Sequence, residues 1–323
     1  MSGNHADLCK AFRAYMFGNS QRVSDYQDIL NAKRFPMQVA LFAGNNLTVS
    51  PGKPLIVESR GVNGDPVVLV YDTITVEPGG EIIYRTNGTV KAQNMIVHGR
   101  SKNNLNNHGG FGGLGSYGGN GANGGAGVKG SPGKDNKSYC ASGATSGSDG
   151  ARGTSGGHGG NGAEGGDTHD VNISVVELSG EVSVSTIGGD GGGGGGGGYG
   201  GHGGDGGNGG ASTSECPAGA GGNGGNGGDS GNGGNGGNGG NGGNIYITYE
   251  YGNPSFNVFA VGGKGGWGGV SGARGTGGTG GTGRTKGSNG ITGNWGTDGN
   301  GGQAGKAGKV FVNGIPVRME AST

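Results

Sequence analysis

The sequence predicts a mostly β and irregular fold: short N-terminal helices, a β-solenoid or sandwich base, then a packed polyglycine-II helix array interleaved with β-strand pairs. The first observation behind this prediction is the glycine content, 93 of 323 residues. The second is its phase, because from Gly263 to Gly308 every third residue is glycine except at Arg284. A three-residue period is that of the polyproline-II family, not the period of about 3.6 of an α-helix or about 2 of a strand.

Residues 1–36 are expected to form short helices. Apolar residues recur on one helical face there: Leu8, Phe12, Tyr15 and Met16. Ser24 and Gln27 have the spacing of a capping box at the start of a second helix. Two interpretations remain open for this segment: a helical cap over the base, or a docking segment for a particle or fibre.

Residues 37–105 read as the β base. Apolar and polar residues alternate in short segments, and turn signals such as Pro51-Gly52 and Pro78-Gly79 separate them. Hydrophobic residues make up only 29% of the chain. We therefore expect this region to carry most of the apolar core.

Residues 106–309 are predicted to form the glycine array. Five stretches keep the phase: Gly109–Gly133, Gly147–Gly165, Ile187–Ala211, Gly221–Asn244 and Gly262–Lys309. Without Cβ atoms, neighbouring backbones approach closely and pair N–H with C=O. Collagen is excluded by nine prolines in the whole chain and by the interruptions. A flexible linker needs glycine content but not glycine phase, so the phase favours packing, and expansion of a codon triplet is the remaining alternative.

Strand pairs are expected at 171–187 and 245–262, inside the glycine region. Both show two-residue alternation, a turn, a second strand and an exit into Gly-Gly-X, with 72 residues between Asn172 and Asn244. Residues 310–323 close the series as a C-terminal strand and tail. Such a repeat buries each unit against its neighbours.

Charge and hydropathy limit the function classes. The chain has 22 basic and 22 acidic residues, and no basic block accompanies its aromatics, which argues against nucleic-acid binding. Residues 1–18 contain Asp7, Lys10 and Arg13, so they do not form a signal peptide. We expect an extracellular or particle-associated protein that is released without a signal peptide, by lysis, dedicated secretion or incorporation into a particle.

Three cysteines are too few for a disulfide framework. Cys140 and Cys216 both stand in breaks of the glycine phase. Either they pair at an edge of the array or both remain thiols, and the sequence leaves the two possibilities open.

Groups that carry chemistry are sparse. The compact His/Asp groupings are Asp167-Thr-His169-Asp170 and His202-Gly-Gly-Asp205, and neither supplies the three or four converging ligands of a metal site. Gly-X-Gly-X-X-Gly occurs only inside the glycine runs, away from any strand–turn–helix unit. We therefore predict no catalytic residue, no metal and no cofactor, and a protein that is not an enzyme.

Exposed side chains on the array are the candidates for recognition. Aromatic rings have no room between glycine faces, so they either cover the β base or lie on the surface, where they suit stacking on sugars or anchoring to a receptor. The predicted receptor-binding residues are Tyr117, Tyr199, His202, Trp267 and Trp295.

Two families resemble the C-terminal two-thirds of the chain. The stretches Gly156–Gly162, Gly201–Asn208 and Thr276–Thr282 are similar to snow flea antifreeze proteins, which implies packed polyglycine-II bundles that bind ice through a flat face. Glycine arms that alternate with non-glycine turns also resemble the receptor-binding adhesins at the tail-fibre tips of T-even-like phages. That resemblance implies an N-terminal attachment part and variable loops that touch a bacterial surface.

Three functions follow as hypotheses. The first is a non-enzymatic recognition protein that binds a cell-surface glycan or membrane protein through the turns of a rigid scaffold. The second is a receptor-binding toxin, for instance insecticidal, whose amphipathic strands enter membranes. The third is ice binding or a structural role.

Overall fold

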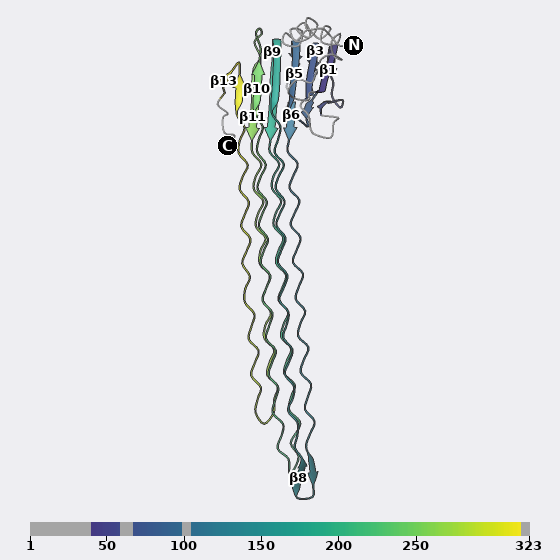
Figure 1. Cartoon of the computed structure of the whole chain (residues 1–323), viewed down its shortest axis with the longest axis vertical. Coiled ribbons are helices and arrows are strands. Elements are labelled where there is room, and N and C mark those ends of the chain that lie inside the picture. Colours follow the sequence, from purple (N-terminus) through teal and green to yellow (C-terminus); the bar gives the residue numbers. More distant parts are fainter. Residues whose placement is uncertain (1–39, 59–66, 99–104, 318–323) are drawn as a thin grey trace, which may run out of the picture.

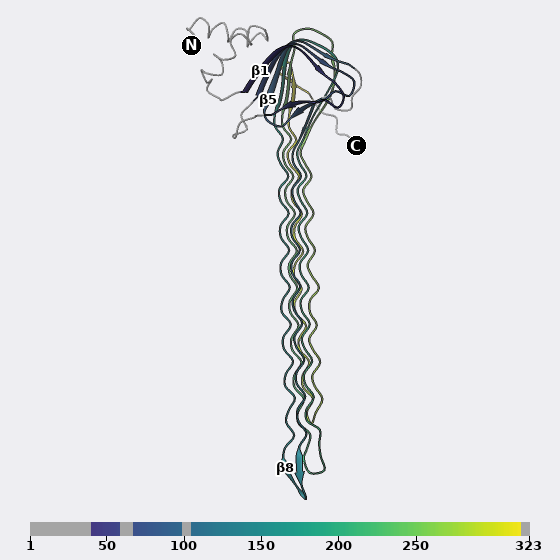
Figure 2. The ribbon, with the colours of Figure 1, turned by 90° about the vertical axis from the view of Figure 1, so that its right-hand side faces the viewer.

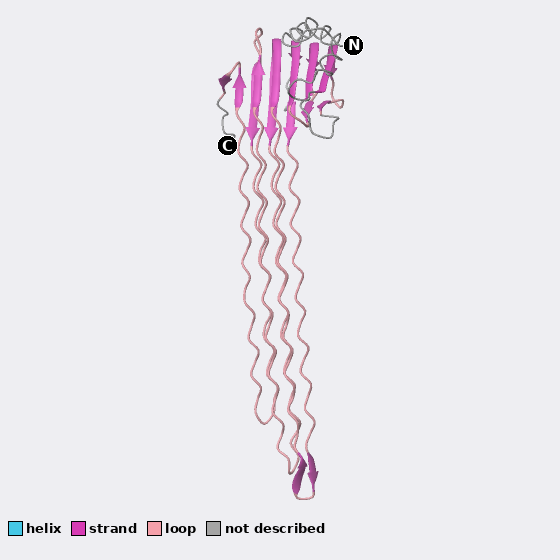
Figure 3. Cartoon of the chain, in the orientation of Figure 1, coloured by secondary structure: helices cyan, strands magenta, loops and turns pink. Residues whose placement is uncertain are grey.

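The computed structural model describes residues 40–58, 67–98 and 105–317. A β base lies at one end, and long extended segments run from it to a distal tip (Figure 1). Viewed from the side, the same segments gather into a narrower bundle (Figure 2). Figure 3 shows strands only in the base and at the distal tip.

The base is built from parallel strands in two rows that together form one 11-stranded sheet among the described residues. The first row contains β1 (Ala40–Val49), β3 (Val67–Val76), β5 (Gly88–Val97), β10 (Ile245–Thr248) and β12 (Val310–Val312). The second contains β2 (Leu55–Val57), β4 (Ile82–Tyr84), β6 (Leu105–His108) and β11 (Ser255–Val261). Strand β9 (Val171–Ile187) belongs to both rows, and β13 (Ile315–Pro316) pairs antiparallel with β12.

The core of the base comes from two-residue alternation. In β5, β9 and β10, Val90, Ile173 and Ile247 lie in register and are almost fully buried. Each such side chain contributes about 1.5–3 kcal/mol on burial. Every turn of the chain therefore adds one layer to a shared apolar interior.

Glycines make the corners between the two rows. Gly180 bends β9 at φ +95°, and a Cβ there would lie 1.9 Å from the Val97 carbonyl oxygen. Gly252 takes the next corner at φ +112°, against the carbonyl oxygen of Leu178. A side chain fits neither position, because φ is positive there and the adjacent coil is too close. A coil here means one passage of the chain through both rows of strands.

Three glycine hairpins extend from the described part of the base, after β6, β9 and β11. Each leaves at the end of one coil, reverses at its tip and returns to begin the next coil. We number their extended segments runs 1 to 6: 109–133, 143–170, 188–211, 219–244, 262–283 and 287–309.

Backbone hydrogen bonds join the runs at every third residue. Gly112 of run 1 donates to Asp190 O of run 3 at 2.8 Å, and Ala163 of run 2 donates to Gly113 O of run 1 at 2.8 Å. Runs 1, 3 and 5 form one parallel layer, runs 2, 4 and 6 form the other, and consecutive runs are antiparallel. A Cβ at Gly234 would lie 1.9 Å from the carbonyl oxygen of Gly160, so this pairing requires glycine.

The predicted fold class was wrong in its organisation. The described residues contain no helix and one large, mostly parallel sheet, so only the sheet-rich part fits. The helices expected over residues 1–36 lie outside the described residues. The segments at 171–187 and 245–262 are not local pairs, because β9 is a single strand and both β10 and β11 pair with it.

The expected repeat length was also wrong, by two residues. Asn172 lies opposite Tyr246, a spacing of 246 − 172 = 74. Hydrogen bonds between runs 3 and 5 recur at the same separation of 74, whereas those between runs 4 and 6 recur at 65. The register is set by stacking Val171 on Ile245, both fully buried, and not by aligning the two asparagines.

Candidate recognition surface

The Gly-Gly-Asn repeat of run 4 is explained by its hydrogen bonds. In each triplet, two glycine N–H groups reach neighbouring carbonyls, while the third N–H points toward the surface. Asn235 N donates to Asn161 Oδ1 of run 2 at 2.9 Å, and Asn300 N of run 6 donates to Asn235 Oδ1 at 2.8 Å. The outward asparagines of this layer therefore accept hydrogen bonds from the outward N–H groups of the next run. We call this surface of runs 2, 4 and 6 the asparagine face.

The opposite surface, from runs 1, 3 and 5, divides along its length. Far from the base, polar side chains form the same ladder: Asn123 Oδ1 accepts from His202 N at 2.8 Å, and His202 Nδ1 accepts from Thr276 N at 3.0 Å. The hydroxyls of Thr279 and Thr282 donate to Asp205 and Asn208. His202, one of the predicted binding residues, thus helps to hold the array together.

Near the base, the same surface carries large apolar side chains. We call this part the aromatic face, and its exposed side chains are Phe111, Leu114, Tyr117, Tyr199, Trp267 and Val270. Their placement follows from backbone register, because Gly115 donates to Gly193 O and Gly194 donates to Trp267 O. The next row joins Gly118 to Gly196 O and Gly197 to Val270 O. Two adjacent rows are formed in this way, and their side chains come from runs 1 and 5, on either side of run 3. The first row holds Leu114 and Trp267, and the second holds Tyr117 and Val270.

Two glycines of run 3 make room for the rings. A Cβ at Gly193 would lie 2.4 Å from the Trp267 ring, and one at Gly196 would lie 3.2 Å from the Tyr117 ring. Gly193 is buried although its row faces outward, whereas Trp267 is 69% exposed and Tyr117 is 86% exposed. One edge of the indole thus reaches over Gly193 of run 3, and most of the ring is open to solvent.

Trp295 lies apart from this group, on run 6. The guanidinium carbon of Arg274 lies 5.2 Å from its ring centroid, a cation–π contact at the edge formed by runs 5 and 6. The structure therefore brings together Tyr117, Tyr199 and Trp267 of the five predicted residues, and it separates Trp295 from them.

The distal tip joins two hairpins covalently. Strands β7 (Lys134–Asn136) and β8 (Tyr139–Ser142) form the tip of the first hairpin. Cys140 of β8 forms a disulfide with Cys216, in the turn of the second hairpin. Tyr139 is the large exposed aromatic at this end, so the tip offers less apolar surface than the aromatic face.

The His/Asp groupings contribute to backbone capping. Asp167 and Asp170 accept the N–H groups of Asn241 and Asn244. Hydrogen bonds from the backbone and side chain of Thr279 lower the pKa of Asp205. Within the described ranges, no three His, Cys, Asp or Glu side chains group to hold a metal ion.

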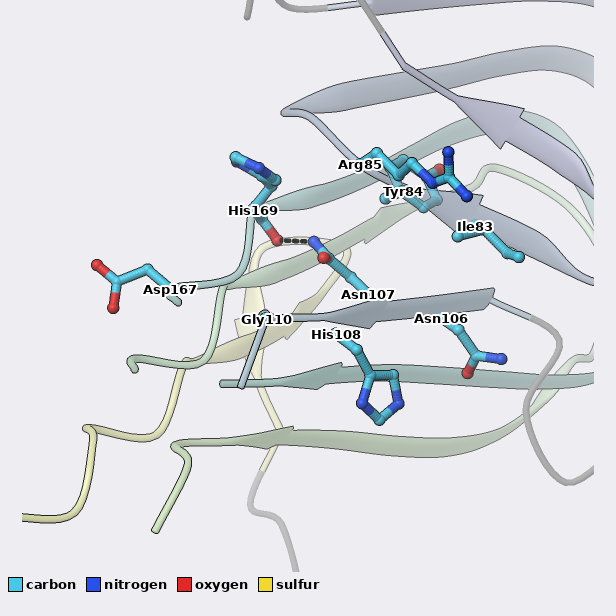
Figure 4. Close-up of a pocket in the computed structure, with 10 residues that line it drawn as sticks. Ile83, Tyr84, Arg85, Asn106, Asn107, His108, Gly110, Asp167 and His169 are labelled. Atoms are coloured by element: carbon cyan, nitrogen blue, oxygen red, sulfur yellow. Dashed lines mark hydrogen bonds between the residues drawn. The ribbon is translucent and has the colours of Figure 1, made fainter. Parts of the chain in front are cut away.

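A pocket of about 450 Å³ lies where the base meets the array (Figure 4). Its polar lining includes His108, Asp167 and His169, and Figure 4 shows these three side chains pointing away from one another. Asn107 Nδ2 donates to the backbone oxygen of His169 at 2.6 Å, which ties β6 to the end of run 2. The pocket therefore lacks a convergent polar set.

Comparisons with known proteins add little. No family model matches the chain, and no curated protein matches it. Among solved structures, the chain is weakly similar to the nine polyproline type II helical bundle springtail antifreeze protein from Granisotoma rainieri, at 24% identity, covering 59% of this chain and 94% of that one. The TM-score of this match is 0.08. No helix among the described residues is long and apolar enough to cross a membrane.

Sequence reasoning missed the partners that complete the aromatic face. Leu114 and Val270 come from runs 1 and 5, and the register that joins them depends on the coils of the base. One feature of the sequence points to the site: the eight consecutive glycines 191–198, in which the outward positions 193 and 196 also lack side chains. The array does not need glycine at outward positions, as the asparagines of run 4 demonstrate.

Proposed function

We propose that this protein is a non-enzymatic recognition protein that binds a cell-surface receptor through the aromatic face. The observation that carries the proposal is the gathering of exposed Tyr117, Trp267 and Val270 on two adjacent rows of one surface. Exposed apolar clusters of this kind mark interaction sites, and aromatic residues dominate binding energy at such sites. The proposed contact therefore lies on the side of the glycine scaffold and not in its turns.

The glycine array suits this role because it is rigid. Runs 3 and 4 are each paired with neighbours along their length, so the face is formed before binding. Preorganisation lowers the conformational entropy lost on association. The aromatic rings then meet a partner without a loop having to order first.

An adhesin of the phage tail-fibre-tip class fits this scheme best. In that case residues 1–36 attach the protein to a particle or fibre, and the protein acts outside the cell that made it. The proposal needs no catalytic residue, cofactor or nucleic acid. Ice binding is less well supported, because the hydroxyls of Thr276, Thr279 and Thr282 all contact array side chains.

Binding of labelled protein to intact bacterial and animal cells, measured by flow cytometry, tests the proposal. We expect saturable binding to at least one cell type, and at least a tenfold loss for the Tyr117→Ala/Trp267→Ala double variant. Trp295→Ala is the matched control, because it removes an exposed indole from a different edge. Binding to no cell, or undiminished binding by the double variant, would contradict the proposal; dye release from liposomes would instead favour the membrane-active toxin.

A further inference from the structure

We infer that the aromatic face is a stacking platform for a neutral oligosaccharide, an inference that rests on the proposed recognition function. The platform consists of Trp267 and Tyr117 with the two glycines beneath them, Gly193 and Gly196. Each ring comes from a flanking run and leans over run 3, where these glycines leave the backbone bare.

Ring orientation is the first argument for a sugar. The indole atoms nearest to the Cβ position of Gly193 are Cε2, Nε1 and Cζ2, at 2.4, 2.5 and 2.8 Å, three consecutive atoms along one long edge, so this edge of the ring lies over the glycine. The indole is 69% exposed, so most of its flat surface is open to solvent. The C–H face of a pyranose ring is apolar and flat, and it is complementary to such a surface.

The spacing of the rings is the second argument. Trp267 and Tyr117 belong to consecutive rows, and three residues at about 3.1 Å each put the rows about 9 Å apart along the array. A single sugar ring cannot contact both aromatic rings at this separation. A linear glycan of two or more units can, so the geometry favours an extended chain over a monosaccharide.

The polar surroundings are the third argument, and they favour an uncharged ligand. In the row nearer the base, Asp190 Oδ1 accepts the backbone N–H of Lys264 at 2.7 Å, so this row contains one acidic and one basic residue. On the distal side, Asn120 Oδ1 accepts the N–H of Tyr199, and its amide group remains a donor. These groups offer hydrogen bonds to hydroxyls without a net charge.

The Gly193→Ala variant tests the platform while leaving the pairing of the glycine runs intact. The added methyl group meets the Trp267 ring, a side chain that can move, so the ring must leave its position while the array stays paired. Gly119→Ala is the matched control, because its methyl group meets nothing within 4 Å. Neither variant should lower the melting temperature, and only Gly193→Ala should lose binding, by at least tenfold.

The experiment uses cells that bind the wild-type protein, divided into three samples: untreated, oxidised with sodium periodate, and digested with proteinase K. Periodate cleaves the vicinal diols of sugars and spares the polypeptide backbone. We expect periodate to abolish binding and the protease to leave it, with Gly193→Ala weak on untreated cells and Gly119→Ala normal.

The remaining outcomes separate a glycan from a protein receptor, and both of these from a failure of the proposed function. Binding that survives periodate but not protease would overturn the glycan while leaving a protein receptor and the proposed function intact. Loss under both treatments is resolved by adding glycans released from the same cells, since competition supports the inference and its absence overturns it. If no cell type binds the wild-type protein, the proposed function fails and this inference fails with it.

Discussion

The side-chain oxygen of Asn235 lies 2.8 Å from the backbone nitrogen of Asn300 in the neighbouring run. The same relationship recurs along runs 4 and 6, for example between Asn238 and Gln303 and between Asn241 and Lys306. Glycine permits the close approach of two runs, and asparagine accepts the one N–H group that would otherwise face solvent. The Gly-Gly-Asn triplet is therefore a complete hydrogen-bonding unit.

Replacing an asparagine of this ladder should weaken the array locally. Asn235→Ala removes the acceptor for Asn300 N, and we expect a loss of about 0.5–1.5 kcal/mol in the free energy of unfolding. Asn235→Asp keeps an acceptor oxygen and should remain close to wild type. Chemical denaturation of both variants measures the difference, and equal stability of Asn235→Ala and wild type would show that the ladder contributes nothing.

Adjacent glycines of run 1 should respond in opposite ways to the same substitution. A Cβ at Gly118 would lie 2.0 Å from Gly157 O, whereas a Cβ at Gly119 meets nothing within 4 Å. Gly118→Ala should therefore cost about 1–3 kcal/mol through overpacking. Gly119→Ala should be neutral or slightly stabilising, because alanine restricts the unfolded chain. Thermal melts compare the two, and a similar loss in both would refute the packing seen here.

Acid should destabilise the array through two aspartates. Hydrogen bonds from Thr279 and Ser271 lower the pKa of Asp205 and Asp298 below the ordinary value of 3.8. Because the folded state binds fewer protons, this stabilisation is present above about pH 4 and is lost as the pH falls through the folded pKa values. Melting temperatures between pH 2 and pH 6 measure the effect.

The control for this pH effect is Asp205→Asn/Asp298→Asn, which keeps the acceptors but cannot titrate there. The double variant should match wild type at pH 6 and lose less stability than wild type on acidification. Identical slopes for the two proteins would mean that these carboxylates do not couple to unfolding.

Removing the disulfide should affect the distal tip first. Cys140→Ser/Cys216→Ser breaks a link between residues 76 apart in sequence, which in the chain-entropy model stabilises by about 4.5 kcal/mol. Amides in 134–142 and 212–218 should exchange faster, while β5 and β9 stay protected because the base has its own apolar core. Faster exchange in the base, with no change at the tip, would contradict this division.

The sequence predicts the close packing of the glycine runs, but it does not predict their order or their register. Glycine phase indicates close backbone packing, and run 3 pairs with its neighbours as that expectation requires. The phase says nothing about which run lies beside which, since every Gly-Gly-X triplet fits every other. Register comes from the coils of the base, where burial of Val171 and Ile245 aligns the hairpins. Without that register, Tyr117 and Trp267 cannot be assigned to adjacent rows, and the ladder role of His202 cannot be recognised.

Residue-resolved amide hydrogen exchange of run 1, followed by NMR, tests the paired glycine array most directly. Gly112, Gly115 and Gly118 donate to run 3, whereas the N–H groups of Gly110, Gly113 and Gly119 have no partner among the described residues. The structure predicts strong protection at the first three positions and exchange near free-chain rates at the others, a three-residue alternation within one segment. Uniformly fast exchange along 109–133 would contradict the array, and with it the rigid face on which recognition depends.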